Sequence, residues 1–260
     1  MATVGFFRKF RIGMLLVVLF LVATNSYLTR LRATDWREPL WMVIYPVNGD
    51  GSEASRHEID RLQTDEFADI ERFFAQELGR WGGQLPDPVT VKLAPPVHAL
   101  PPLPPPGGGP LAIMWWSLKL RLWALGHDSF TGPEPDVRMY VLYHDPEAHA
   151  RLPHSLGLQK GMIGVVHAFA GPREARRNQV VIAHEFLHTV GASDKYDPAT
   201  NLPRYPEGFG EPDRRPRFPQ RYAEIMGGRI LLSVDRAVMP DSLQQCRVGG
   251  QTAREIRWID

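Results

Sequence analysis

Hydrophobic and polar positions follow two periods along this chain, and each period predicts a type of element. Ile59, Phe67, Phe74 and Leu78 recur near a period of 3.6 with charged residues between them, which predicts a helix over residues 55–80. Short apolar or alternating runs bounded by Gly, Pro, Asn or Asp predict strands. These strands lie at residues 40–47, 89–93, 137–143 and 162–169. The pattern therefore predicts an α+β fold.

Further helices follow from the same pattern. Residues 111–125 carry a helical apolar stripe, and although part of this stretch also alternates like a strand, its length favours a helix. Asn178 is a credible N-cap for a helix over residues 179–190, and Gly191 is placed to end it. The other segments are a Pro/Gly-rich loop, an irregular stretch and two short helical pieces, at residues 95–110, 197–221, 242–245 and 252–258.

The N-terminus predicts a location. Arg8, Lys9 and Arg11 precede an uncharged apolar run at residues 12–23, which continues weakly to residue 28. We expect residues 1–30 to form a transmembrane signal-anchor with its basic end in the cytoplasm, since no good small-x-small cleavage site follows. Residues 31–37 would then be a juxtamembrane link, and the rest of the chain would lie in the periplasm or outside the cell. A cleaved signal peptide and a secreted protein are the alternative.

Composition and charge narrow the class of protein. The chain has 260 residues, of which 43% are hydrophobic and 23% charged, so one substantial domain with a real core is expected. The formal net charge is +1, which gives no indication of nucleic-acid binding. Cys246 is the only cysteine, so no intrachain disulfide can form, and we expect this side chain to be a small buried residue.

One stretch carries clear chemistry. Residues 184–194 read HEFLHTVGASD, which places His184 and His188 four residues apart on one helical face. Two neutral imidazoles on one face are good Zn²⁺ ligands, and a catalytic zinc site usually adds a third protein ligand and a water. Glu185 faces the same region but is one residue out of step, which suits a general base and then acid.

The third ligand must come from beyond the helix. Gly191 allows a left-handed turn, after which Asp194 could return to the metal. Asp197 is the nearest competitor. In a different architecture, resembling the gluzincins, a later carboxylate would be the third ligand. The candidates for that role are Glu207, Glu211 and Glu224.

The pattern His-Glu-x-x-His-x-x-Gly-x-x-Asp resembles that of the metzincin zinc peptidases, in the snapalysin-like variant with Asp as the third ligand. Met226, in residues 223–228, resembles the methionine of the family's Met-turn, so the motifs span residues 178–228. The resemblance implies a zinc metallopeptidase, and by default an endopeptidase, that acts on a protein or peptide. It also implies a domain at residues 38–260 with a small twisted mixed sheet and an active-site helix in an upper part, 38–191, and an irregular lower part, 192–260.

Some roles stay open at this point. No tyrosine closely follows Met226, and Tyr196, Tyr205 and Tyr222 are all candidates to stabilise an oxyanion. By analogy with the family's edge strand, residues 162–169 are expected to pair with an extended substrate. A non-catalytic, zinc-containing module that binds peptides or envelope components is an alternative from another class of protein.

The remaining histidines do not predict a second site. His144 and His149 are five residues apart and do not share a helical face, and His167 lies in an expected strand. Four others are expected on the surface or in loops, namely His57, His98, His127 and His154. The sequence also lacks a Gly-x-Ser-x-Gly elbow, a phosphate-binding loop and a dinucleotide-binding glycine motif.

Overall fold

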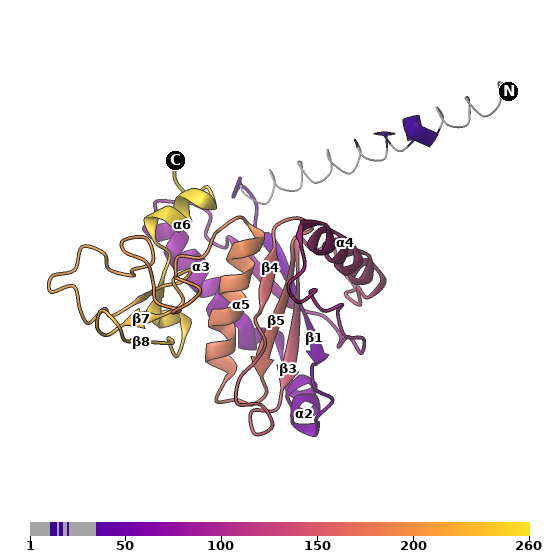
Figure 1. Cartoon of the computed structure of the whole chain (residues 1–260), viewed down its shortest axis with the longest axis horizontal. Coiled ribbons are helices and arrows are strands. Elements are labelled where there is room, and N and C mark those ends of the chain that lie inside the picture. The colour runs from indigo at the N-terminus through magenta and orange to yellow at the C-terminus, as the bar shows by residue number, and fades with distance from the viewer. Residues whose placement is uncertain (1–10, 15, 18–19, 21–34) are drawn as a thin grey trace.

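A five-stranded mixed sheet forms the centre of the protein (Figure 1). The computed structural model describes residues 11–14, 16–17, 20 and 35–260. The strand order is β2-β1-β3-β5-β4, with β4 antiparallel to β5 and the other neighbours parallel. The strands are β1 (Leu40–Asn48), β2 (Val89–Leu93), β3 (Val137–His144), β4 (Leu156–Leu158) and β5 (Ile163–Phe169). The predicted α+β class is confirmed, and β4 is a strand that the sequence pattern did not predict.

Side chains that alternate along the strands build a core on each face of the sheet. Met42 and Ile44 of β1 face the core that contains Phe74 and Phe186, whereas Val43 and Tyr45 face the other one. The first core is covered by α3 (Ala68–Arg80) and α5 (Ala175–Thr189), and the second by α4 (Pro110–Gly126). Because both faces are covered, the parallel strands read as continuous apolar runs.

The helix predicted over residues 55–80 is interrupted. It consists of α2 (Glu53–Arg61), the 3-10 helix η1 (Thr64–Phe67) and α3. Leu62 leaves the helical conformation with ψ 135°, and Gln63 then begins the next turn in a reciprocal capping box with Glu66. All three pieces pack on the same core, so the apolar period continues across the break. The period alone therefore does not reveal where the helix is interrupted.

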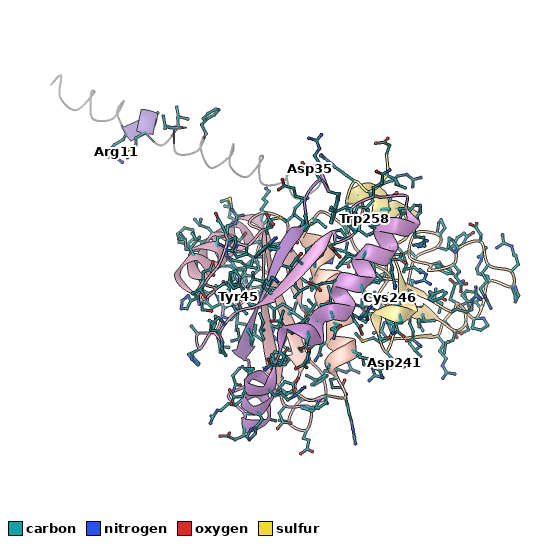
Figure 2. All side chains as sticks on the ribbon, turned by 180° about the vertical axis from the view of Figure 1, so that it is seen from behind. Arg11, Asp35, Tyr45, Asp241, Cys246 and Trp258 are labelled. Atoms are coloured by element: carbon teal, nitrogen blue, oxygen red, sulfur yellow. The ribbon has the colours of Figure 1, made fainter. Side chains whose placement is uncertain are left out.

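The chain after α5 is largely irregular, as predicted. It contains two small sheets, which pair β6 (Ala223–Glu224) with β9 (Cys246–Arg247) and β7 (Ile230–Leu231) with β8 (Ala237–Val238). The predicted helical pieces are η2 (Leu243–Gln245) and α6 (Gly250–Glu255). Cys246 and Trp258, labelled in Figure 2, pack into the same core as Phe186, which confirms the expected burial of the cysteine.

Trp36, in the predicted link, packs against the folded domain. Its indole N–H donates a hydrogen bond of 2.7 Å to the Ile256 carbonyl, and its ring meets that of Trp258 edge to face. An indole that is stacked and hydrogen-bonded in this way belongs to the domain surface. The fold therefore includes the last residues of the segment at 31–37.

The prediction of a transmembrane anchor is wrong for the part of the chain that the structure describes. Within residues 11–14, 16–17, 20 and 35–260, no helix is both long enough and apolar enough to cross a membrane. A span needs about 20 consecutive apolar residues, and the run at residues 12–23 is followed by the polar Thr24, Asn25 and Ser26. Residues 1–10 and 21–34, which hold much of the predicted anchor, lie outside the described part of the chain.

Candidate metal centre

The helix α5 presents its two motif histidines on one face. Their Nε2 atoms are 3.2 Å apart, and their rings meet at 81° with centroids separated by 4.8 Å. The neighbouring residues Phe186 and Leu187 are fully buried in the core, which fixes the rotation of the helix about its axis. The spacing of four residues therefore brings the two imidazoles together as predicted.

A tight turn returns Asp194 to this pair. The helix ends at Thr189, Gly191 adopts φ 110°, and the Ala192 N–H donates back to the Leu187 carbonyl. The Asp194 Oδ1 atom then lies 3.2 Å from the Nε2 atoms of both His184 and His188. The three ligand-type atoms form a triangle with equal sides of 3.2 Å.

The size of this triangle suits a tetrahedral metal ion. Zinc bonds to nitrogen and oxygen of about 2.0–2.1 Å place neighbouring ligand atoms about 3.3 Å apart. The chemistry of the set also fits, because two imidazoles and a carboxylate are ligands that zinc accepts together. The residues present therefore fit the metal that the sequence motif implies.

Backbone carbonyls orient both imidazoles. The Nδ1 atom of His184 lies 2.9 Å from the Ile225 carbonyl oxygen, and that of His188 lies 2.8 Å from the Ala192 oxygen. A carbonyl oxygen only accepts hydrogen bonds, so each Nδ1 carries the proton and donates it. In the neutral, metal-binding form of each ring, the Nε2 lone pair is then directed at the shared position, which is the usual arrangement of metal-binding histidines.

Charge favours a cation between these side chains. Burial lowers the pKa of His184, but the hydrogen bond to Asp194 and the charge of Glu185 outweigh it and raise that pKa to about 9. Burial raises the pKa of Asp194, yet its hydrogen bonds to His184 and His188 lower it well below its usual range. The centre thus stabilises positive charge at the ring nitrogens.

Glu185 is buried beside this centre and is incompletely paired. The residue is 6% exposed, and its Oε2 atom has no hydrogen-bond partner within the described part of the chain. Burial raises the pKa of its carboxyl group, although the nearby His184 and His188 lower it. A buried carboxylate with a free acceptor atom is suited to receive a proton from a water molecule.

The turn that contains Met226 lies directly behind His184. Met226 is fully buried, its carbonyl accepts the Lys195 N–H at 2.9 Å, and the preceding Ile225 carbonyl is the partner of His184. The Gly227 N–H closes the turn onto the Glu224 carbonyl at 2.9 Å. Residues 224–227 therefore connect the lower part of the domain to the histidine pair.

The competing carboxylates have other roles. Glu224 is buried and accepts from Gly227 N–H, Gly249 N–H and the Thr252 hydroxyl, so both of its oxygens are engaged. Glu211 pairs with Arg221, and Asp197 accepts from the backbone of the turn that follows it. Within the described residues, Asp194 is the carboxylate that groups with His184 and His188.

The three candidate tyrosines differ in their surroundings. Burial raises the pKa of Tyr196, and the charge of Asp194 and a hydrogen bond to it add to this effect, so Tyr196 lies at the centre. Tyr205 stacks beneath Arg217 with 4.1 Å from the guanidinium carbon to the ring centroid, and Tyr222 lies in the same way beneath Arg247 at 4.0 Å. Tyr196 is thus the tyrosine that contacts a motif residue.

The edge strand beside the centre is β4 and not β5. β3 pairs with the whole of β5, and on the other side β4 pairs with Ile163–Val165, so the prediction that residues 162–169 pair with a substrate stays a prediction only for the stretch after Val165. Gly157 of β4 packs directly on α5, since a Cβ atom there would collide with the Glu185 carbonyl oxygen and lie 2.7 Å from the His188 Cβ. The free side of β4 is therefore the sheet edge next to the histidines.

His154 and a second histidine group were missed at the sequence level. His154, in the loop before β4, lies close enough to Glu185 to lower its pKa. Asp50, His144 and His149 also come together, far from α5 in the chain. No local spacing joins any of these residues, so only the fold reveals them.

Comparisons with known proteins add no family. No model of a known protein family matches the chain, and no curated protein matches it.

Proposed function

We propose that this protein is a zinc-dependent metallopeptidase whose domain resembles those of the metzincins. The observation that supports this most directly is the triangle of 3.2 Å sides formed by His184, His188 and Asp194, with the unpaired Oε2 of Glu185 buried beside it. The mixed sheet, the helix that carries both histidines and the buried Met226 turn agree with the architecture that the motif implies.

The residues of the chain would divide the work of peptide hydrolysis. A bound zinc ion would supply a Lewis acid for the scissile carbonyl and the attacking water. Glu185 accepts the proton that the water loses and later passes it to the leaving amine. Tyr196, which hydrogen-bonds to Asp194, would donate a hydrogen bond to the oxygen that becomes negative.

The substrate would be an extended segment of a peptide or protein. The outer side of β4 can add one strand to the sheet, and main-chain hydrogen bonds of this kind do not depend on the substrate's side chains. Because β4 spans three residues, only a short stretch of substrate would pair. An endopeptidase with modest selectivity is the expected activity.

A Glu185→Gln variant tests this proposal. The purified protein, loaded with zinc, is mixed with a peptide library, and new amino termini are counted by mass spectrometry. We expect cleavage by the wild type and a loss of about 100-fold or more in the variant, since general acid–base catalysis typically contributes ~10²–10⁴-fold. Zinc content and the circular dichroism spectrum are expected to stay unchanged.

The matched control is Glu53→Gln, which alters an exposed glutamate in α2. It should cleave as the wild type does. Equal cleavage by wild type and Glu185→Gln would contradict the role of Glu185. A wild type that holds zinc stoichiometrically but cleaves nothing would contradict the peptidase proposal and favour the non-catalytic binding module.

A further inference from the structure

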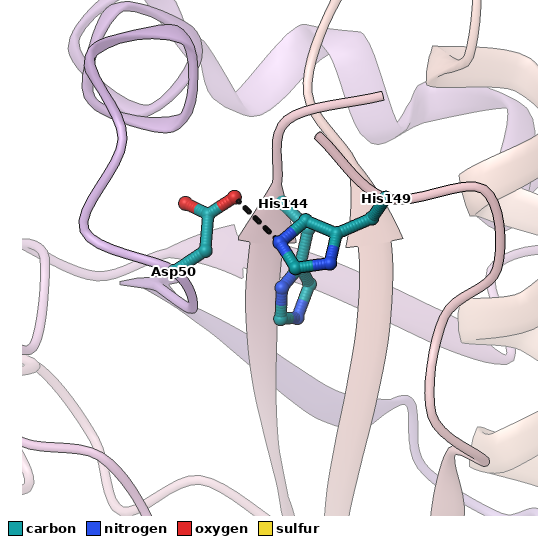
Figure 3. Close-up of side chains that lie close together, drawn as sticks. All are labelled: Asp50, His144 and His149. Carbon is teal, nitrogen blue, oxygen red and sulfur yellow. Dashed lines mark ion pairs between the residues drawn. The ribbon is translucent and has the colours of Figure 1, made fainter. Parts of the chain in front are cut away.

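Three ligand-type side chains meet at the carboxyl end of the parallel strands, on elements other than α5 (Figure 3). Asp50 follows β1, His144 is the last residue of β3, and His149 lies in the loop that leads to β4. One ligand atom from each residue lies within 4.8 Å of the other two. Because β1 and β3 are adjacent and parallel, their carboxyl ends meet, which is where open α/β sheets usually bind ligands.

The Asp50 carboxylate is held in a fixed orientation. Its Oδ1 accepts from the Ser52 N–H at 3.0 Å and from the Ser55 hydroxyl at 2.9 Å, while its Oδ2 accepts from the Asp145 N–H at 2.7 Å. The same Oδ2 lies 3.4 Å from the Nε2 atom of His149. An ionised oxygen that is already positioned toward an imidazole costs little to order when a cation arrives.

His144 is buried and oriented by another histidine. It is 6% exposed, and its Nε2 lies 2.9 Å from the Nδ1 of His167 on the neighbouring strand β5. The ring fits closely against Gly49, where a Cβ atom would lie 2.7 Å from its Cε1 and Nε2. Metal-binding histidines are commonly held in this way through a hydrogen bond to one ring nitrogen.

His149 completes the group and can adjust. Its side chain is 40% exposed and lies in a loop, so a small rotation would bring its nitrogen to the roughly 3.3 Å spacing of ligands around a tetrahedral ion. Two imidazoles and one carboxylate are also the donor set of the centre on α5. Such a set suits zinc and other first-row divalent metals better than calcium or magnesium, which prefer oxygen.

We propose that Asp50, His144 and His149 bind a second first-row divalent metal ion, zinc by preference, which fixes the loop between β3 and β4 to the ends of β1 and β3. The loop continues into β4, the strand that packs on Glu185 and His188. This ion would therefore hold in place the sheet edge that adjoins the centre on α5.

Metal counting on the full-length protein tests this proposal. Wild type, His149→Ala, His188→Ala and the double variant are loaded with zinc, freed of excess ion by gel filtration and analysed by mass spectrometry of the metal. The control is His98→Ala, which removes an exposed histidine of the Pro-rich loop. We expect two zinc ions per chain in the wild type and in the control, one in each single variant and none in the double variant.

A thermal shift provides the second readout. In the His188→Ala background, added zinc should raise Tm, because an ion that binds only the folded state stabilises it by mass action. In the double variant, which also carries His149→Ala, added zinc should leave Tm unchanged. Equal zinc content in the wild type and His149→Ala, or an unchanged shift in the double variant, would overturn the second site. Neither result would contradict the proposed peptidase, because the zinc ion of the centre on α5 is removed by His188→Ala alone.

Discussion

Asp194 and Asp197 are close in sequence but have different roles. The Asp194 Oδ1 atom lies 3.2 Å from two imidazole nitrogens, whereas the Asp197 carboxylate accepts hydrogen bonds from Ala199 and Thr200 in its own turn. The difference follows from Gly191, whose left-handed backbone directs the chain back toward α5. At this scale a single residue decides which carboxylate reaches the histidines.

Replacing Asp194 with Ala should therefore weaken zinc binding. We expect zinc affinity to fall by more than about 10–100-fold, because removing even a residue that only orients a metal ligand typically costs that much. Asp197→Ala should leave zinc binding near that of the wild type. Titration against a chromogenic chelator measures both, in the His149→Ala background, so that the proposed second site does not contribute. Stoichiometric zinc in Asp194→Ala with unchanged affinity would show that this side chain is not a ligand.

Local spacing explains which site residues can be predicted. His184, Glu185 and His188 lie on one helix, so a period of 3.6 residues is enough to place them together. Asp50 and His144 meet only because β1 and β3 are neighbours in the sheet, and no pattern within either segment contains that information. A site built from separate elements becomes visible only with the fold.

The packing of β4 on α5 brings a strand directly against the metal centre. Gly157 allows this approach, because its missing side chain leaves space for the Glu185 carbonyl and the His188 Cβ. The strand has only three residues, Leu156–Leu158, and none of them is fully buried, so it is too short for a hydrophobic pattern to identify it. The strand was therefore not predicted, whereas β2, whose side chains alternate, was predicted with its observed ends at residues 89 and 93.

A methyl group at Gly157 should separate the two elements. We expect Gly157→Ala to cost roughly 1–3 kcal/mol of unfolding free energy, as overpacking usually does, and to lower zinc affinity because His188 is displaced. The matched control is Gly79→Ala in α3, where the added Cβ meets nothing within 4 Å. That change should stabilise the protein by about 0.4–1 kcal/mol. Chemical denaturation measures both, and equal effects would contradict the contact.

The start of α5 shows that helix-capping rules read from the sequence can also misplace a helix end. Asn178 was predicted to cap this helix, which instead begins at Ala175. The Asn178 side chain makes two hydrogen bonds to the backbone of Phe169, at the end of β5. The same amide group can satisfy a helix end or a strand end, and tertiary contact decides between them.

At the scale of the whole molecule, one buried glutamate joins the upper and lower parts of the domain. Glu77 of α3 is 2% exposed and accepts from Arg80, from Arg247 and from the Val248 N–H at 2.7 Å. The Arg247 carbonyl accepts from Ile225 N–H, whose own carbonyl orients His184. A continuous series of hydrogen bonds thus runs from α3 to the metal centre.

Glu77→Ala should weaken both stability and metal binding. We expect a loss of roughly 2–3 kcal/mol, because a buried N–H loses a charged acceptor while the arginines remain partly hydrated. Zinc affinity should fall with it. Glu53→Ala, which breaks an exposed ion pair, should cost less than about 1 kcal/mol. If urea denaturation gives the two variants the same stability, Glu77 does not join the two parts.

The two edge strands of the sheet affect whether the protein aggregates at high concentration. On β2, the outward N–H of Val91 is already taken by the Glu71 carboxylate at 2.7 Å, and on the other side β4 offers only three residues. Neither edge can template a long strand from a second molecule, so edge-to-edge aggregation is disfavoured. The free side of β4 can pair with a few residues of an extended peptide, but it is too short to nucleate a fibril.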